Sequence, residues 1–524
     1  MPDASHSPTG DALPVAFPSA VSRREFLRLL SVASSAPLTA APLLAEVDAA
    51  VKPGKPLKVI IAGAGLAGLC AAYELEKRGH ECVILEADGS HVGGRVRTLR
   101  LQDGLYGEAG AMRVPEAHQI TRHYLKELGV ALRPFVYSND NAWCYLRGHR
   151  ARLKDLDRLK PHFALSEREK TMSTGDMWKT SVVSRLEKLS AAEKADMLAA
   201  EPVTAACQAL DRLSLRQLLE ADGFTDEAIE MAAVIWGQEA LLDSAATEHL
   251  REEMENVWNL RFDEIVGGTD RFATAFVSKL KSKPRTGCEI IRLEQSADGK
   301  RAAAVFRNRA NKGAEEREEG DFLICTLPCP VLGRIETPGF SGEKARSIRQ
   351  LVYDSSTKVL AVTKRRFWET DDGIYGGGTF TDLPTATTYY PADNAQAKDP
   401  AVSAKPSVFL ASYSWGQQAR RLGVLEPTAQ RDVVLSHLSK VHPQLAEPGM
   451  VTRAVGWSWD RHPWSGGAFA WFNPGQHGAL HRHLLEPEGR IHFAGEHASL
   501  AHTWMQGALE SALRAVKEVL AARA

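Results

Sequence analysis

The strongest constraint on the fold is a glycine-rich turn near the start of the chain, Gly63-Ala-Gly65-Leu-Ala-Gly68. A short β-branched run, Lys58 to Ala62, precedes it and predicts a buried parallel strand. After the turn, Leu69 to Arg78 has the apolar spacing of a helix, and Glu81 to Leu85 predicts a second strand. Strand, turn, helix and strand in this order predict a βαβ unit of a Rossmann-like fold.

The same turn predicts a site for the pyrophosphate of a dinucleotide. In the GxGxxG pattern Gly63 permits the tight turn, Gly65 lets backbone approach the phosphates, and Gly68 lets the helix pack on the strand. The unpaired N–H groups at the start of the helix then face the anion. Glu86 ends the second strand, where a carboxylate would accept the ribose hydroxyls. A nicotinamide dinucleotide would satisfy this pattern as well as a flavin one.

Two further segments favour FAD. Gly93-Gly94-Arg95 follows Glu86, and there the glycines allow close backbone approach while Arg95 adds a cation for phosphates. Near the C-terminus, Phe493-Ala-Gly495-Glu496 precedes a helix expected from about Met505 to Ala522. On these segments the chain resembles the flavin amine oxidase superfamily, which includes monoamine, polyamine and L-amino acid oxidases. The resemblance implies a bound FAD.

The resemblance also implies which residues would contact that cofactor. The helix after Glu496 is expected to point its N-terminus at the flavin pyrimidine, where its dipole stabilises negative charge. Ala468 stands where monoamine oxidases carry a cysteine bonded to the flavin, so non-covalent FAD is expected. The expected contacts are Gly63, Gly65, Leu66, Ala67, Gly68, Glu86, Ala87, Gly93, Gly94, Arg95, Gly110, Ala111, Met112, Arg113, Ile290, Gly495, Glu496, Trp504 and Met505.

The expected fold class is α/β, with a discontinuous Rossmann-like FAD-binding domain, a mixed α+β substrate domain and an inserted helical domain. At 524 residues the chain is too long for one core. The FAD-binding domain is expected at 56–98, 262–350 and 486–524, and the substrate-binding domain at 99–153 and 351–485. Residues 154–261 have a charged, helical pattern and predict the helical domain. The charged stretch 308–320 is expected to be a solvated hairpin tip.

The substrate prediction starts from Arg113. In Gly110-Ala-Met112-Arg113 the chain resembles the L-amino acid oxidases, whose arginine at this place pairs with the substrate carboxylate. A planar guanidinium is the natural partner for a carboxylate. Tyr413 is the expected second carboxylate contact, with Tyr389 and Tyr390 as alternatives.

Two more catalytic residues are expected, Lys358 and Trp504. Lys358 lies within an otherwise apolar strand, where a lysine is costly unless paired or hydrated. The resemblance implies that it holds a water against flavin N5 and assists the reaction with oxygen. Trp504 is expected as an aromatic wall of the pocket, together with the run 464–471. Thr503 replaces the glycine of the family's animal members and leaves the shape of the pocket open.

The expected function is FAD-dependent oxidative deamination of an L-amino acid to a 2-oxo acid, ammonia and hydrogen peroxide. Hydride would pass from Cα to flavin N5, and O2 would reoxidise the flavin. The alternatives are an L-amino acid 2-monooxygenase or an oxidase of amines without a carboxylate. A net charge of -1 argues against nucleic acid as a partner. No metal site is expected, since the seven cysteines are scattered. A homodimer is expected from the resemblance.

The first fifty residues predict export. Ser22-Arg-Arg24-Glu-Phe-Leu-Arg28 precedes an Ala-rich apolar stretch and resembles the twin-arginine signal, with Arg28 in place of the usual lysine. Residues 1–50 are therefore expected to be the export signal and linker of a periplasmic or secreted protein. Prolines and serines make the apolar stretch too weak for a membrane span, and no later span is expected.

Overall fold

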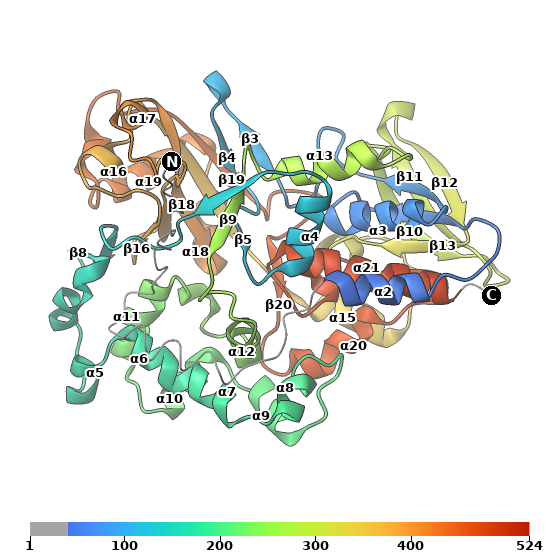
Figure 1. Cartoon of the computed structure of the whole chain (residues 1–524), viewed down its shortest axis with the longest axis horizontal. Helices are drawn as coiled ribbons and strands as arrows, with labels where there is room; N and C mark the ends of the chain where they lie inside the picture. The colour runs from blue at the N-terminus through green and yellow to red at the C-terminus, as the bar shows by residue number, and fades with distance from the viewer. Residues whose placement is uncertain (1–39, 523–524) are drawn as a thin grey trace, which may run out of the picture.

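The computed structural model describes residues 40–522. Figure 1 shows three regions: a parallel sheet with its helices, a large sheet beside it, and an arc of helices from α5 to α12. The twin-arginine motif lies outside the described residues, so export stays a prediction. Among the described helices none is long and apolar enough to cross a membrane.

The first region is built on a four-stranded parallel sheet of order β2-β1-β13-β21. Its centre is fully apolar, because β1 and β13 are covered on both faces and carry buried residues. In the register, Val59 of β1 lies beside Phe322 of β13 and Cys82 of β2. The strands are β1 (Lys58–Ala62), β2 (Glu81–Leu85), β13 (Phe322–Cys325) and β21 (Ile491–Phe493).

Two layers cover this sheet. Helices pack on one face, and a three-stranded antiparallel sheet with short helices packs on the other. The helical layer contains α3 (Leu66–Lys77), α13 (Asp270–Lys279) and α21 (Met505–Ala521); the other layer contains β10 (Cys288–Gln295), β11 (Ala302–Asn308), β12 (Ala314–Gly320), α14 (Cys329–Leu332), α15 (Gly342–Gln350) and α20 (Arg482–Leu485). This arrangement confirms the Rossmann-like α/β fold.

One expectation about this region needs correction, and a second segment has a structure that the sequence did not predict. Residues 314–320 form strand β12, paired along its length with β11, so only the turn before it is a hairpin tip. Its charged side chains pair across the sheet surface, which is why a strand could look like a solvated loop. Residues 40–49, expected as signal and linker, form helix α2 (Ala40–Ala49), which packs on α21 and buries Val47.

A third difference concerns α4 (Gln119–Glu127), which lies in the segment expected for the substrate domain. Its apolar face, with Ile120, Tyr124 and Leu125, packs into the core under α3 and α21. The Tyr124 hydroxyl donates to Glu74 of α3 at 2.9 Å. The segment after Arg113 therefore returns to the Rossmann-like region before the chain enters the large sheet.

The second region is a seven-stranded mixed sheet of order β19-β15-β18-β17-β16-β7-β8. The strands β15 and β18 pair antiparallel and place Lys358 opposite Tyr413. The strands are β7 (Trp143–Leu146), β8 (His149–Arg152), β15 (Ser356–Thr363), β16 (Gly378–Thr381), β17 (Thr387–Tyr389), β18 (Ser407–Trp415) and β19 (Val451–Ser458), and its helices are α16 (Phe367–Thr370), α17 (Pro400–Ser403), α18 (Gly416–Gly423) and α19 (Pro427–Leu438).

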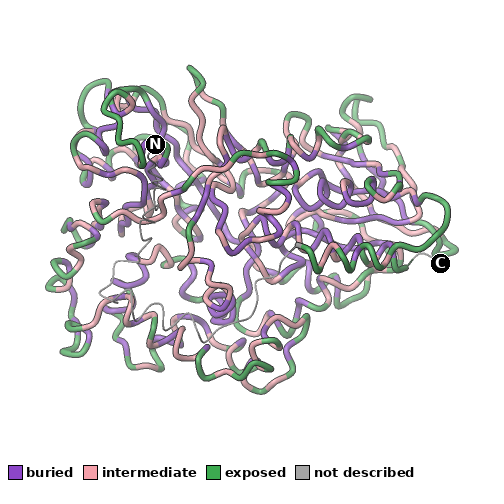
Figure 2. Tube along the Cα trace, viewed as in Figure 1, coloured by how far each residue is buried: buried purple, intermediate pink, exposed green. Residues whose placement is uncertain are grey.

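The third region is the arc of helices between residues 167 and 254. Several of these helices begin at serine or threonine caps, for example Ser166, Ser214 and Thr225. The helices are α5 (Glu167–Thr171), α6 (Thr174–Trp178), α7 (Ser184–Lys188), α8 (Ala191–Asp196), α9 (Ala205–Asp211), α10 (Leu215–Ala221), α11 (Asp226–Trp236) and α12 (Ala246–Met254). They share one hydrophobic core with the seven-stranded sheet. Figure 2 shows exposed residues along the outer turns of the arc.

Three small sheets connect the regions. They join β3 (Thr98–Arg100) to β4 (Tyr106–Glu108), β14 (Val352–Asp354) to β20 (Phe469–Trp471), and β9 (Phe262–Ile265) to both β5 (Val114–Pro115) and β6 (Leu132–Phe135). These pairings bring segments far apart in sequence to the boundary between the parallel sheet and the seven-stranded sheet.

Candidate active site

A cavity lies where the three regions meet, running from the glycine turn to strands β15 and β18. It gathers nearly all the residues that the sequence singled out. Those that line it are Gly63, Gly65, Leu66, Ala67, Glu86, Ala87, Gly93, Gly94, Arg95, Gly110, Ala111, Met112, Arg113, Ile290, Lys358, Tyr413, Gly495, Glu496, Trp504 and Met505.

Gly68 is the exception, because it does not line the cavity. A Cβ atom there would stand 2.0 Å from the carbonyl oxygen of Gly63, so Gly68 closes α3 against the turn. Gly63 has a φ of +102°, which favours glycine. At Gly65, by contrast, a Cβ atom would project into open space at the cavity wall. The turn therefore presents bare backbone and the start of α3 to the cavity, as a phosphate site requires.

Glu86 lies at the same end of the cavity. Its carboxylate accepts from the backbone N–H of Ala64 at 2.9 Å and of Asp88 at 2.8 Å. Burial raises the pKa of Glu86, and the backbone donors oppose that rise. The carboxylate thus stands at the ribose end of the expected dinucleotide site.

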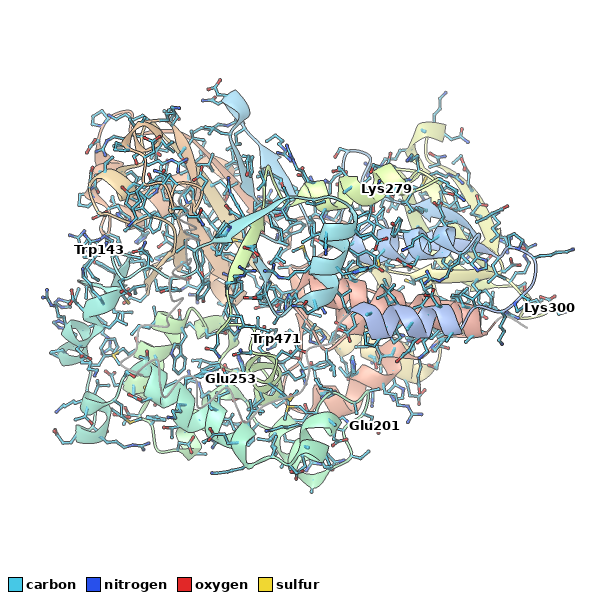
Figure 3. All side chains as sticks on the ribbon, viewed as in Figure 1. Trp143, Glu201, Glu253, Lys279, Lys300 and Trp471 are labelled. Atoms are coloured by element: carbon cyan, nitrogen blue, oxygen red, sulfur yellow. The ribbon has the colours of Figure 1, made fainter. Side chains whose placement is uncertain are left out.

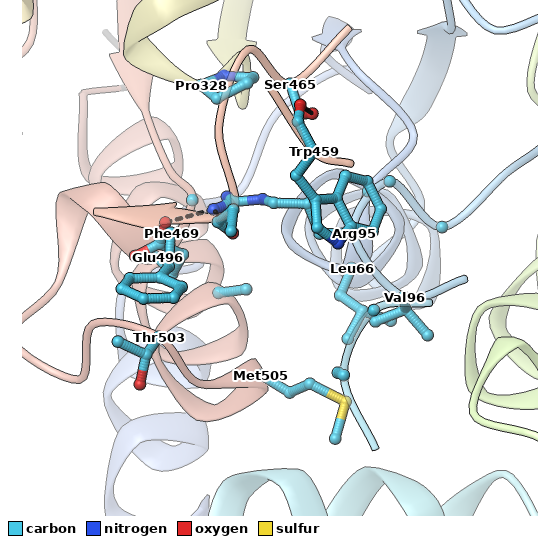
Figure 4. Close-up of a pocket in the computed structure, with 18 of the residues that line it drawn as sticks. Leu66, Arg95, Val96, Pro328, Trp459, Ser465, Phe469, Glu496, Thr503 and Met505 are labelled. Atoms are coloured by element: carbon cyan, nitrogen blue, oxygen red, sulfur yellow. Dashed lines mark hydrogen bonds and ion pairs between the residues drawn. The ribbon is translucent and has the colours of Figure 1, made fainter. Parts of the chain in front are cut away.

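Arg95 and Glu496 form an ion pair in the cavity lining, in which Glu496 is buried and Arg95 is partly exposed (Figure 4). Arg95 also donates to the carbonyl oxygen of Ala468 at 3.1 Å. Glu496 Oε1, which forms the ion pair with Arg95, accepts as well from the backbone N–H of Ala470 at 2.9 Å. Glu496 Oε2 is buried without a hydrogen-bond partner among the described residues. An acceptor left free in this place fits a ligand that brings hydroxyl donors, such as the ribityl chain of FAD.

Arg113 is buried, with 8% of its surface exposed, and it lines the cavity. It makes no ion pair with a described carboxylate; its hydrogen bond is a donation to the Tyr389 hydroxyl at 3.4 Å. Aromatic rings surround the guanidinium at 5.1 to 5.9 Å from their centroids: Tyr137, Trp258, Phe262, Tyr389 and Trp504. Such rings stabilise a cation without neutralising it.

The three tyrosines considered for the substrate carboxylate lie in different places. Tyr413 lines the cavity together with Arg113. The Tyr389 hydroxyl accepts from Arg113 and lines the hollow that adjoins this cavity, which Arg113 and Tyr413 also line. Tyr390 is buried directly after β17 of the seven-stranded sheet, and its hydroxyl bonds to Thr379 at 2.8 Å and to His442 at 2.5 Å. The structure therefore places Tyr413 and Tyr389 in hollows lined by Arg113, whereas Tyr390 lines neither of them.

Lys358 is buried in β15 and reaches the cavity with its amine. The amine donates to the carbonyl oxygens of Gly110 at 2.6 Å and Glu108 at 3.2 Å, and lies 4.4 Å above the ring of Tyr413. Burial lowers the pKa of Lys358 because desolvation disfavours the ammonium. The carboxyl group of Glu108 opposes this shift, and burial raises the pKa of Glu108 itself.

Trp504 immediately precedes α21, whose first residue, Met505, also lines the cavity. The start of this helix therefore faces the cavity, as the sequence predicted. Thr503, just before Trp504, has a φ of +71°, in the left-handed region that β-branched residues rarely adopt. The run 464–471 contributes Trp464, Ser465, Ala468, Phe469 and Trp471 to the same wall.

Sequence reasoning missed several cavity residues. Glu252 and Trp258 come from the end of the helical arc, and Trp415 and Trp459 come from the ends of strands β18 and β19 of the seven-stranded sheet. The indole of Trp459 donates to the carbonyl oxygen of Ala109 at 2.9 Å and so braces the segment before Arg113. The tryptophans could have been found from the sequence, since a tryptophan near a turn is a recognisable signal. Glu252 carries no such signal, because it lies in a charged run typical of an exposed helix.

A second hollow adjoins the cavity and shares Arg113, Gln238, Trp258, Tyr413 and Trp415 with it. Its wall comes from the helical arc and from the seven-stranded sheet. Seven aromatic residues line it: Tyr137, Trp236, Trp258, Phe380, Tyr389, Tyr413 and Trp415. Polar residues share the lining, among them Glu239, Gln417 and Arg421, so it offers a chamber of mixed polarity beside the guanidinium of Arg113.

Known proteins resemble this chain in sequence and in fold. Relatives include an L-amino-acid oxidase of Siganus canaliculatus, 33% identical over 88% of this chain and 85% of that protein, and a putative L-amino-acid oxidase of Bacillus subtilis, 32% identical over 88% and 95%. A putrescine oxidase solved with putrescine bound shares the fold, with a TM-score of 0.71 at 20% identity over 90% of this chain and all of that chain. The family described as flavin containing amine oxidoreductase matches residues 66–520. The chain therefore belongs to the flavin-containing amine oxidoreductases, a family of oxidoreductases that use FAD.

Proposed function

We propose that this oxidoreductase deaminates an L-amino acid oxidatively, giving a 2-oxo acid, ammonia and hydrogen peroxide. FAD, which would be held in the cavity without a covalent bond, would supply the acceptor for the hydride of the substrate Cα–H, with O2 as the final electron acceptor. The imino acid left behind is hydrolysed by water. The protein's own part is to bind and orient the amino acid and to exclude competing ligands.

The observation that carries this proposal is the unpaired guanidinium of Arg113. A buried charge is costly unless it is compensated, and the aromatic rings around Arg113 leave both edges of its fork without a carboxylate among the described residues. A planar carboxylate is the ligand that matches this fork. A simple amine would bring a second cation beside it, which is unfavourable.

The other residues have complementary roles in the proposal. Tyr413 supplies a hydroxyl to the carboxylate, and Trp504 closes one wall. Lys358 places an amine at the junction of Gly110 and Tyr413, in position to hold a water and assist oxygen. The relatives named as L-amino-acid oxidases support the same substrate class.

The test uses purified yellow holoenzyme and measures peroxide on addition of single L-amino acids. Arg113→Met should lower kcat/KM for an L-amino acid by about 100-fold, since charge-assisted bonds contribute about 1.5–3 kcal/mol each. Arg133→Met is the control, because Arg133 is paired with Glu264 at 2.6 Å and does not line the cavity.

Two outcomes would contradict the proposal. One is an Arg113→Met enzyme that retains wild-type turnover of the amino acid. The other is a wild-type enzyme that oxidises phenethylamine better than L-phenylalanine, which would point to an amine without a carboxylate. Analysis of the product separates the oxidase from a monooxygenase, because only the latter gives the amide.

A further inference from the structure

Helix α12 carries two adjacent glutamates that both accept from indole N–H groups. Glu252 Oε1 accepts from Trp504 Nε1, and its Oε2 accepts from Trp258 Nε1, both at 2.7 Å. Glu253 accepts from Trp178 Nε1 at 3.0 Å and from Asn259 (Glu253 is labelled in Figure 3). Glu252 lines the cavity, whereas Glu253 does not.

The indoles that bind Glu252 are the same ones that lie against Arg113. The guanidinium carbon stands 5.2 Å from the ring centroid of Trp258 and 5.8 Å from that of Trp504. An aromatic ring is negative on its face and positive at its N–H edge. The cation therefore meets the faces and the carboxylate meets the edges.

This arrangement keeps two opposite charges in one cavity without pairing them. Arg113 and Glu252 make no ion pair with each other, although Arg113 is close enough to favour the ionised form of Glu252. A direct pair would neutralise both groups and close the site to charged ligands. With the indoles between them, each charge stays available.

Glu252 also has unused capacity for hydrogen bonds. A carboxylate offers about four acceptor positions, and the two indoles occupy one on each oxygen. Burial raises the pKa of Glu252, while Trp504, Trp258 and Arg113 act in the opposite direction. No described cation forms an ion pair with Glu252, so its remaining positions suit a cation that arrives with the substrate.

We propose that Glu252 is a specificity-determining residue that receives the ammonium group of the substrate, so that the cavity selects a zwitterion. Arg113 takes the carboxylate and Glu252 the ammonium, which excludes both amines without a carboxylate and acids without an amine. This inference rests on the proposed function, because it assumes an amino acid between the two groups.

The experiment measures binding to the holoenzyme by calorimetry, with ligands that cannot be oxidised. The zwitterion is α-methyl-L-phenylalanine, which lacks a Cα–H bond; its partner is 2-methyl-3-phenylpropanoate, which has hydrogen in place of the ammonium. The aromatic lining of the adjoining chamber motivates the phenyl group. Glu252→Gln is nearly isosteric, and Glu253→Gln is the matched control because it also loses an indole bond on the same helix.

We expect Glu252→Gln to weaken binding of the zwitterion at least tenfold and to leave the acid within threefold of wild type. Glu253→Gln should change neither ligand by more than threefold. The inference is overturned if Glu252→Gln binds both ligands as wild type does, or weakens both equally, since the carboxylate would then only hold the tryptophans in place.

The wild-type enzyme gives an independent test should Glu252→Gln fail to fold. It should bind the zwitterion at least tenfold more tightly than the acid, and equal or tighter binding of the acid overturns the inference. Failure of the proposed function looks different: wild type would then bind neither ligand, or Arg113→Met would bind both as wild type does.

Discussion

Lys358 shows how a single side chain can be tuned by where its backbone places it. The strand β15 is buried along its whole length, so the amine is removed from water and held by the carbonyl oxygens of Gly110 and Glu108. Its pKa is lowered by burial. The ammonium form is therefore present at low pH and is lost at a lower pH than in a free lysine.

The replacement Lys358→Met should slow the reaction of reduced enzyme with O2 at least tenfold while leaving anaerobic reduction by substrate within threefold. In wild type the oxygen rate should fall as pH rises through the lowered pKa of Lys358, and the variant should lack this fall. Stopped-flow absorbance measures both steps. Lys344→Met is the control, because Lys344 is also a fully buried lysine but does not line the cavity, and it donates to the carbonyl oxygens of Leu484 and Glu486. Wild-type oxygen rates in Lys358→Met would contradict the assigned role.

At the scale of residues, the sequence predicted those whose chemistry is local. Gly63, Gly65 and Arg95 lie in glycine-rich turns, which neighbouring residues in the sequence identify. Glu252 could not be found this way, because its partners Trp258 and Trp504 come together only when α12 packs beside the start of α21. Its charged surroundings in sequence are typical of an exposed helix face, yet it faces the cavity.

Among the elements, helix α12 connects the helical arc to the segment that precedes α21. Glu248 pairs with Arg251 at 2.8 Å and accepts from His502 Nδ1 at 2.9 Å, two residues before Trp504. His249, on the next position, is fully buried and bonds through Nε2 to Ser244 at 3.0 Å. A polar helix is thus held almost entirely inside the protein.

This burial makes a prediction for stability against pH. Burial lowers the pKa of His249 to about 4, below the ordinary value of about 6.5. Between these values the unfolded chain binds a proton that the folded protein does not, so unfolding becomes easier as pH falls. The difference in unfolding free energy between wild type and His249→Asn should drop by about 2 kcal/mol from pH 7 to pH 5. Denaturant titration at both pH values measures it, and an unchanged difference would refute the buried neutral imidazole.

Elements with their own periodic signal were predicted well, as in β1, α3 and β2. Those defined by distant partners were not. The strand β12 is a run of charged residues whose Arg317 pairs with Glu294 of β10 only across the sheet, and α4 packs in the core with α3 and α21 rather than with the neighbouring sheet. In both, tertiary packing decided the outcome.

At the scale of the whole molecule, the three regions meet at the cavity. Its lining combines the glycine turn, strands of the seven-stranded sheet and the end of the helical arc. FAD bound there would contact groups that come together only in the folded state. A ligand of the folded state alone adds about 2.7 kcal/mol at 100 times its dissociation constant.

Removing FAD should therefore lower the melting temperature, and adding it back should raise it in proportion to the logarithm of its concentration. Differential scanning calorimetry of the protein with and without added FAD measures this. Riboflavin, which lacks the pyrophosphate and adenosine, is the control and should restore little. Equal melting temperatures with and without FAD would mean that the cavity does not bind the cofactor through the folded regions.

The order of strands in the parallel sheet affects when the sheet can form during synthesis of the chain. The strand β1 is made early, but its neighbour β13 follows only after the helical arc, and β21, which pairs with β13, follows only after the last strand of the large sheet. While the ribosome is still translating, the glycine turn has half its sheet and none of the helix that begins at Met505. The parallel sheet and the helix that follows it can therefore be completed around the cofactor only after residues beyond 490 have been made.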